Sequence, residues 1–320
     1  MNNMKKVKKI KIKKKKWSRD DTELSLLALP TVVWYLLFCY LPMFGIIIAF
    51  KNYKIFPGHN FLYNLIHSDW VLSNFKYLIN SKDIYMLVRN TLCYNIVFIV
   101  LGIFIQVTLA IMISLLYSKW KSKVYQTLMF FPYFMSWVVI SYFVYAFLSM
   151  DKGILNGVLN YFGKDNIQWY MESKYWPFIL TFMQMWKMTG YNMVIYLASI
   201  TGIDSTYYEA AVIDGATKWQ QIKYVTLPCI KTVVVMMFIL SVGRIFYSDF
   251  GLFYQIPRGV SSSLYNAVST LDTYIFSNLQ ANLPVGMTAA ATFFQSVACF
   301  ITVMLANWIV RKVDNESAII

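Results

Sequence analysis

Long hydrophobic runs, separated by shorter polar segments, dominate the pattern of this chain of 320 residues. Three runs contain no charged residue at all: Leu24–Phe50, Thr91–Tyr117 and Val124–Met150. Each exceeds the roughly 20 residues that a helix needs to cross the hydrocarbon core of a bilayer. The pattern therefore predicts membrane-spanning helices.

The other three hydrophobic runs carry at most two charged residues each: Tyr175–Ile203, Thr232–Pro257 and Leu283–Val310. We predict an all-α membrane protein with a six-helix transmembrane domain over residues 24–312. The predicted spans lie at about 24–50, 91–117, 124–150, 175–203, 232–257 and 283–310. The chain also has a basic tail, 1–23, a loop between the fourth and fifth spans, 204–230, and a short C-terminal tail, 313–320.

The composition agrees with a membrane protein, because 58% of the residues are hydrophobic and only 14% are charged. A net charge of +14 could indicate nucleic-acid binding, but ten of the 29 Lys and Arg residues lie within the first 19 positions. We interpret the Lys5–Lys16 run as an anchor to anionic membrane lipid. No nucleic-acid partner is expected.

The basic residues also predict the orientation of the chain. With a cytoplasmic N-terminus, eighteen Lys and Arg residues fall in inner segments and nine in outer segments. This satisfies the excess of positive charge that cytoplasmic loops carry. Both termini and the loop 204–230 are therefore expected in the cytoplasm.

The loop 204–230 has the pattern of a short helix followed by a new membrane helix. Thr206 and Glu209 have the spacing of a capping box, and Asp204 is a further cap-type residue. Pro228 disfavours a helical conformation at the residue before it and suits the first turn of a helix. We therefore predict a capped helix, a turn, and a fresh helix near Pro228.

Residues with almost no side chain fill much of this predicted loop helix. Ala211 and Gly215 are four apart, so on a helix they share a face that another backbone can approach closely. Gly215 lowers helix stability by roughly 1 kcal/mol relative to alanine, and with Asp214 beside it predicts an end or a bend. An ordinary amphipathic loop helix is the alternative interpretation.

The run Glu-Ala-Ala-x-x-Asp-Gly-Ala at 209–216, followed by Leu227-Pro228, resembles the EAA loop of binding-protein-dependent ABC importer permeases. Leu41-Pro42 and the Phe-Phe-Pro-Tyr at 130–133 are similar to the type I importer permeases of the carbohydrate group, in particular the LplB-like branch for complex oligosaccharides. Many members have a second proline where this chain has Thr232. The resemblance implies a six-helix permease fold. It also implies that an ATP-hydrolysing subunit docks onto Glu209, Ala210, Ala211, Asp214, Gly215 and Ala216.

The same resemblance implies the partners and the location. These are a second, homologous permease in a heterodimer, two ATP-binding subunits, an extracellular solute-binding protein, and the plasma membrane of a bacterium. The chain has no Gly-rich phosphate loop ending in Lys-Ser/Thr and no nucleophile–base set, so we do not expect it to be an enzyme. We expect no metal or other cofactor in this chain, with ATP and magnesium on the partner ATPase subunits.

Charged residues near the middle of two predicted spans are candidates for the substrate pathway, because a charge at that depth usually faces a bundle interior or an aqueous cavity. Amide, hydroxyl and aromatic neighbours suit the hydroxyl groups and ring faces of a sugar. The candidates are Gln184, Lys187, Tyr191, Asn192, Arg244, Tyr247 and Asp249. The alternative is that Lys187 or Arg244 pairs with Asp249, or with the partner permease, only to neutralise charge.

We therefore expect a permease subunit of an ATP-driven oligosaccharide importer, in which ATPase motion drives alternating access. The two cations Lys187 and Arg244 outnumber the single carboxylate of Asp249, which favours an acidic sugar. A neutral sugar is the alternative. A secondary transporter of a small polar solute is the alternative, but it needs ion-coordinating groups near the midplane, and Asp249 is the only acidic residue inside a predicted span. A membrane-bound transferase is a third hypothesis, which no paired carboxylates or His/Asp set favour.

Overall fold

The computed structural model describes residues 18–281 and 284–313, and every named element in these ranges is helical. The basic run at 5–16 and nearly all of the tail 313–320 lie outside these ranges. The elements up to the first inner turn are α1 (Arg19–Tyr35), η1 (Leu36–Tyr40), α2 (Leu41–Met43), η2 (Phe44–Phe50), α3 (Phe61–His67), α4 (Ser73–Asn80) and α5 (Ile84–Ser114).

The next group runs to the end of the loop after the fourth span: α6 (Lys119–Phe130), η3 (Phe131–Phe134), α7 (Trp137–Leu148), α8 (Ile154–Tyr161), η4 (Ser173–Tyr175), α9 (Trp176–Thr201) and α10 (Ser205–Ile213). The last group is α11 (Lys218–Gln221), η5 (Ile222–Thr226), α12 (Leu227–Val242), η6 (Gly251–Gln255), α13 (Tyr265–Val268), α14 (Leu271–Gln280) and α15 (Val285–Val313).

The chain divides into two units, residues 1–47 and 48–320. In the first unit, Ser18 and Asp21 form a reciprocal capping box that starts α1. Farther on, η1 is a π-helical turn in which the N–H of Leu41 donates to the carbonyl of Leu36, one residue before Pro42. The helical run that contains this turn covers Arg19–Phe50 and is long and apolar enough to span a membrane.

In the second unit, α9 is the helix that connects two buried clusters. Its first half packs with α5, α7, η6 and α13, through residues that include Tyr94, Ile140, Trp176, Leu180, Phe253 and Leu264. Its second half packs with α5 and α12, through Ala110, Ile113, Met193, Tyr196, Leu197, Ile200 and Ile230. Many apolar side chains elsewhere on α5, α7 and α15 are exposed, as expected for surfaces that face lipid or another subunit.

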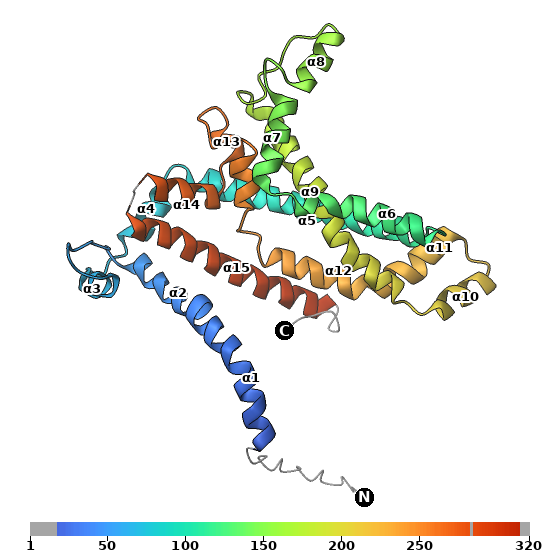
Figure 1. The fold of residues 1–320 in the computed structure, drawn as a ribbon, viewed down its shortest axis with the longest axis horizontal. Coiled ribbons are helices and arrows are strands. Elements are labelled where there is room, and N and C mark those ends of the chain that lie inside the picture. Colours follow the sequence, from blue (N-terminus) through green and yellow to red (C-terminus); the bar gives the residue numbers. More distant parts are fainter. Residues whose placement is uncertain (1–17, 282–283, 314–320) are drawn as a thin grey trace, which may run out of the picture. The chain divides into compact units, whose positions relative to one another are not determined.

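The third expected span, 124–150, is broken. α6 and η3 form its first part and α7 its second, and the two parts meet at an angle of 97°. Pro132 lies in the 3₁₀ turn η3, and Met135 and Ser136 then adopt extended conformations before Ser136 caps α7. The hydrophobic run therefore predicted the elements but not the bend (Figure 1).

The fifth expected span, 232–257, differs most from the structure. The continuous helix covers Lys218–Val242 and includes α11, η5 and α12, so it starts earlier and ends earlier than expected. The chain beyond Val242 turns and only resumes helical structure at η6. The prediction that a new helix begins near Pro228 was also wrong, because Leu227 is helical and a continuous helix runs through the proline.

Among the described helices, four are long and apolar enough to cross a membrane: Arg19–Phe50, Ile84–Ser114, Lys218–Val242 and Val285–Lys312. The bent pair of α6 and α7 would make a fifth. α9 occupies the fourth expected span with 26 residues, and polar side chains interrupt it. This arrangement agrees broadly with the six predicted helices.

Candidate functional site

A cavity of about 720 Å³ lies between α5, α9, α12 and the non-helical stretch that follows α12. Its wall is mixed, with aromatic, aliphatic and polar side chains. Six of the seven predicted pathway residues line it: Gln184, Tyr191, Asn192, Arg244, Tyr247 and Asp249. The sequence therefore identified most of one connected site, although the residues come from segments about 50 positions apart.

The non-helical stretch at 243–249 supplies one wall of this cavity. Backbone groups at membrane depth need hydrogen-bond partners, so irregular structure is tolerated there only inside protein or beside water. Asn95 of α5 donates through Nδ2 to the carbonyls of Ile245 and Tyr247, at 2.9 Å each. Gln295 of α15 donates to the carbonyl of Phe246 at 3.0 Å. Two amide side chains thus hold the break that shapes the cavity.

Lys187, the seventh predicted pathway residue, does not line the cavity. Its side chain is buried, and its Nζ donates to the carbonyls of Tyr133 (3.0 Å) and Met135. These carbonyls lie at the break between η3 and α7, where the chain has no helical partner for them. The ammonium group also lies 5.1 Å from the ring centroid of Trp137. Lys187 therefore stabilises the bend of the third span.

A close contact beside Lys187 fixes the same bend. A Cβ atom added at Gly190 would collide with the carbonyl oxygen of Met129, in the last turns of α6. Glycine at this position lets α6 approach the backbone of α9 directly. One turn of α9 therefore holds both the end of α6, through Gly190, and the break that follows it, through Lys187.

Asp249 accepts three hydrogen bonds from neighbouring groups. Trp137 donates through Nε1 at 2.8 Å, and the backbone N–H groups of Gly251 and Leu252 donate at 3.0 and 3.3 Å. The last two bonds start the π-helical turn η6. The alternative of a direct pair between Lys187 and Asp249 does not form, and the indole of Trp137 contacts both residues instead.

Arg244 has different surroundings. Its side chain is exposed at the cavity wall, and no carboxylate in residues 18–281 and 284–313 forms an ion pair with it. The nearby Asp272 of α14 accepts hydrogen bonds from the backbone N–H and hydroxyl of Ser248 and from Gln295. The cavity therefore presents an unpaired guanidinium group, which can bind a carboxylate through two parallel hydrogen bonds.

Two tyrosines form another part of the cavity wall. Tyr133 of η3 and Tyr191 of α9 stack with ring centroids 4.3 Å apart and an interplanar angle of 10°. Both line the cavity, and the backbone carbonyl of Tyr133 is one of the two that Lys187 holds. Stacked rings of this kind offer an apolar surface to the C–H face of a sugar.

The predicted coupling residues lie in α10 and the turn after it. The helix starts at Asp204, whose side chain accepts from the N–H of Thr206 at 2.9 Å, and this bond holds the pKa of Asp204 below its usual value. The expected capping box of Thr206 and Glu209 is wrong, because both residues lie inside the helix. A capping box instead starts α11, between Thr217 and Gln220.

The end of α10 is a Schellman motif. The N–H of Ala216 donates to the carbonyl of Ala211, and the N–H of Gly215 donates to the carbonyl of Val212. Gly215 has a φ of +76°, which glycine adopts without steric cost. The prediction of a helix end at Gly215 is confirmed, but Gly215 lies beyond the helix and so cannot share a helix face with Ala211.

α10 buries none of its side chains in this unit. Glu209, Ala210, Asp214 and Gly215 are exposed, whereas Ala211 and Ala216 are half-buried. Large apolar side chains on the same helix, notably Tyr207, Val212 and Ile213, are also more than half exposed. A short, capped helix with uncovered apolar residues has the features of a protein-binding element.

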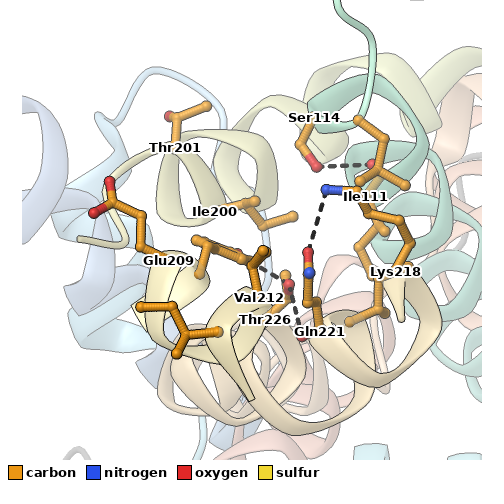
Figure 2. Close-up of a pocket in the computed structure, with 13 residues that line it drawn as sticks. Ile111, Ser114, Ile200, Thr201, Glu209, Val212, Lys218, Gln221 and Thr226 are labelled. Carbon is orange, nitrogen blue, oxygen red and sulfur yellow. Dashed lines mark hydrogen bonds between the residues drawn. The ribbon is translucent and has the colours of Figure 1, made fainter. Parts of the chain in front are cut away.

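A second cavity, of about 560 Å³, lies beside α10, between the last turns of α5 and α9 and the helix α11 (Figure 2). Glu209 and Lys218 lie on opposite sides of it, and Lys218 donates to Gln221 at 3.3 Å. Gln221 in turn donates to the carbonyl of Ala216, and Tyr208 is 2.9 Å from the hydroxyl of Thr226. These bonds connect the turn after α10 to the helix that continues as α12.

Four residues of the site were not predicted from the sequence: Asn95, Trp137, Asp272 and Gln295. Each lies in a hydrophobic run or an outer segment, where a polar or indole side chain gives little signal by itself. Asn95 and Gln295 could have been found by asking which amides in otherwise apolar helices must have a buried partner. No group of three or more metal-ligating side chains was found in the part of the chain that the structure describes.

Comparisons with known proteins are consistent with this geometry. Residues 99–315 match the family model of the binding-protein-dependent transport system inner membrane component. The chain is 30% identical over 294 residues to the polygalacturonan/rhamnogalacturonan transport system permease protein YteP of Bacillus subtilis (strain 168), covering 92% of this chain and 89% of that protein. It is 27% identical to the protein LplB of the same organism, covering 93% and 91%.

A solved structure is also similar: a crystal structure of a bacterial ABC transporter involved in the import of the acidic polysaccharide alginate. The TM-score is 0.82 at 29% identity, and the match covers 92% of this chain and 97% of the other. A bacterial alginate ABC transporter in complex with an alginate pentasaccharide-bound periplasmic protein gives a TM-score of 0.80 at 30% identity. The family model and these relatives agree that the protein is a multi-pass permease, and the chain belongs to the binding-protein-dependent transport system inner membrane components.

Proposed function

We propose that this chain is one permease subunit of an ATP-driven importer that receives oligosaccharides from an extracellular binding protein. The observation that carries this proposal is the cavity of about 720 Å³, in which stacked tyrosines, amides and a free guanidinium face a common space. Sugar hydroxyls need many hydrogen-bond partners, and sugar C–H faces pack on aromatic rings. The relatives that transport polygalacturonan, rhamnogalacturonan and alginate support the same class of solute.

We further propose that the sugar is acidic. Arg244 is the only cation among the residues lining the cavity, and the one carboxylate there, Asp249, already accepts three hydrogen bonds. A uronate unit would supply the carboxylate that Arg244 lacks. A neutral sugar would leave the guanidinium without a charged partner.

The coupling surface is proposed on α10 and the turn that follows, at Glu209, Ala210, Ala211, Asp214, Gly215 and Ala216. An ATP-binding subunit would receive this helix, and a second subunit would receive the matching helix of a homologous second permease. ATP and magnesium would be held by those subunits and no cofactor by this chain. Hydrogen bonds from the turn to Gln221, in the helix that continues as α12, offer a route by which motion of α10 reaches the cavity wall.

The proposed orientation places both termini and α10 in the cytoplasm of a bacterium. The segments that contain α3, α8 and α13 would then face the exterior, where a binding protein docks. The N-terminal basic run would lie against anionic lipid of the inner leaflet.

The test is reconstitution of the assembled importer in proteoliposomes, with binding protein and tetragalacturonate outside and ATP inside. We expect uptake only when both ATPase subunits and the binding protein are present. The same complex with Gly215→Trp should insert normally but lose most uptake and sugar-stimulated ATP hydrolysis, because tryptophan strains the φ of +76° at this turn and its indole prevents close approach. Uptake by the chain alone, driven by a proton or sodium gradient, would support a secondary transporter instead.

A further inference from the structure

An arginine occupies a backbone position that normally favours glycine, at the outer end of η6. Arg258 has a φ of +59° and is the only non-glycine residue with positive φ in the part of the chain that is described. The hydrogen bonds around it form a Schellman motif, because the N–H of Gly259 donates to the carbonyl of Tyr254 and that of Arg258 to the carbonyl of Gln255. At the equivalent position after α10 the chain has Gly215.

Backbone geometry alone does not explain this residue. An L-amino acid in the left-handed region is strained, and glycine would close the same motif without strain. Strained residues of this kind are found at functional sites, where a side chain has to be held in a particular place. The side chain of Arg258 is therefore the feature that needs an explanation.

The guanidinium group lies over tyrosines of α7. Its carbon is 4.1 Å from the ring centroid of Tyr145 and 6.0 Å from that of Tyr142. Both tyrosines are substantially exposed, and the ring of Tyr170 is 5.9 Å from that of Tyr145. The hydroxyl of Tyr170 is buried and has no hydrogen-bond partner among the described residues. The ring contacts orient the guanidinium while leaving its N–H groups free, since no described carboxylate pairs with it.

The two elements that carry this cluster both begin at the cavity. α7 starts at Trp137, which donates to Asp249 in the cavity wall, and η6 follows Phe250, which also lines the cavity. Tyr145 is eight residues beyond Trp137 on α7, so it lies about 12 Å farther along the helix. In the proposed orientation this direction leads outward, toward the side on which a binding protein would release its sugar.

We propose that Arg258, held over Tyr145 and Tyr142, is an outer subsite that binds the carboxylate of a uronate unit as an acidic oligosaccharide enters the permease. This inference rests on the proposed function and extends it to a second contact for the same chain-like solute. Arg244 would bind one uronate inside the cavity and Arg258 another outside it. Guanidinium groups suit this role because they bind carboxylates through two hydrogen bonds while stacking on aromatic rings.

The backbone conformation provides a specific test, Arg258→Gly. Glycine removes the guanidinium group but relieves the strain, so the variant complex should melt in detergent at a temperature no lower than the wild type. We expect uptake of tetragalacturonate by the assembled importer to fall roughly tenfold or more, as for loss of a charge-assisted hydrogen bond. Arg258→Lys, which keeps the charge but not the fork of donors, should give an intermediate loss.

The matched ligand control is the methyl ester of the same tetrasaccharide, which has the same length but no carboxylates. Binding of the acid and of the ester is also measured directly on the purified complex without binding protein. This measurement compares the two sugars without depending on delivery by the binding protein. We expect Arg258→Gly to weaken binding of the acid and leave that of the ester unchanged. Unchanged binding and uptake of the acid would overturn the proposal.

An equal loss of uptake for acid and ester, with weaker association of the unloaded binding protein, would assign Arg258 to docking of that protein and would also overturn the proposal. Failure of the proposed function is distinguishable, because the wild-type complex would then take up neither sugar. Wild-type uptake with no effect of Arg258→Gly would instead contradict only the outer subsite.

Discussion

Lys187 and Arg244 are two cations within the same helical unit, and their surroundings differ in accessibility and in partners. Lys187 is buried and donates to two backbone carbonyls at the break of the third span. Arg244 is exposed to the cavity and has no ion pair among the described residues. A charge at membrane depth is costly in both places, but only Lys187 is compensated by the chain itself.

The difference shows that depth and charge do not by themselves identify a ligand-binding residue. A broken helix leaves carbonyl groups without partners, and a nearby ammonium group can satisfy them. Arg244 follows a helix end too, but Asn95 and Gln295 already donate to the carbonyls there. Its guanidinium group therefore remains available, and the two cations should respond differently to substitution.

The largest effect is expected for Lys187→Met. Removal of the ammonium leaves the carbonyls of Tyr133 and Met135 without their donor, so the complex should lose roughly 3 kcal/mol of stability. Thermal melting in detergent and the yield of assembled complex measure this loss. The exposed Lys164→Met serves as the control and should melt like the wild type. A stable Lys187→Met complex that has lost only acidic-sugar uptake would place Lys187 in the pathway after all.

A smaller but more selective effect is expected for Arg244→Gln. The substitution removes the free guanidinium of the cavity, so uptake of tetragalacturonate should fall roughly tenfold while that of a neutral tetrasaccharide changes little. The melting temperature should stay within a degree or two of the wild type. Arg311→Gln, at the far end of α15, is a control that should leave both sugars unaffected. Equal loss of both sugars would indicate a structural role for Arg244.

The smallest effect is expected for Tyr133→Leu. The backbone carbonyl of Tyr133 accepts from Lys187, and its side chain lines the same cavity as Arg244. The backbone carbonyl that Lys187 holds is retained, so stability should change little. The stacked ring beside Tyr191 is lost, so uptake of acidic and neutral sugars should fall together by a few-fold. A selective loss of the acidic sugar alone would show that Tyr133 acts through charge rather than through its ring.

Hydrophobic runs predicted the helices well because membrane spans are long and their composition is distinctive. They could not predict breaks. Pro30 lies inside α1 and Pro228 inside a continuous helix, whereas Pro132 lies next to a 97° bend. Pro132 differs from the other two prolines by a tertiary contact. Lys187 satisfies the carbonyls that the bend exposes, and Lys187 is more than 50 positions away in the sequence.

The site was predictable in its residue types but not in their roles. Arg244, Tyr191 and Asn192 do line one cavity, as a cluster of polar residues within apolar runs indicated. The roles of Lys187 and Asp249 depend on Trp137, whose indole bonds to the carboxylate and faces the ammonium. Nothing in the local sequence around Trp137 distinguishes it from the other tryptophans of the apolar runs.

The π-helical turn Ile222–Thr226 affects how the length of this loop can change during evolution. Such a turn closes its hydrogen bond over five residues rather than four, and here the N–H of Leu227 reaches back to the carbonyl of Ile222. The turn is equivalent to a one-residue insertion into an ordinary helix. Deleting one residue there would restore regular helix and leave α11 in nearly the same orientation relative to α12, because the wider turn already accommodates the extra residue. A gap of one residue at this place in an alignment would therefore separate permeases whose coupling loops still point in the same direction.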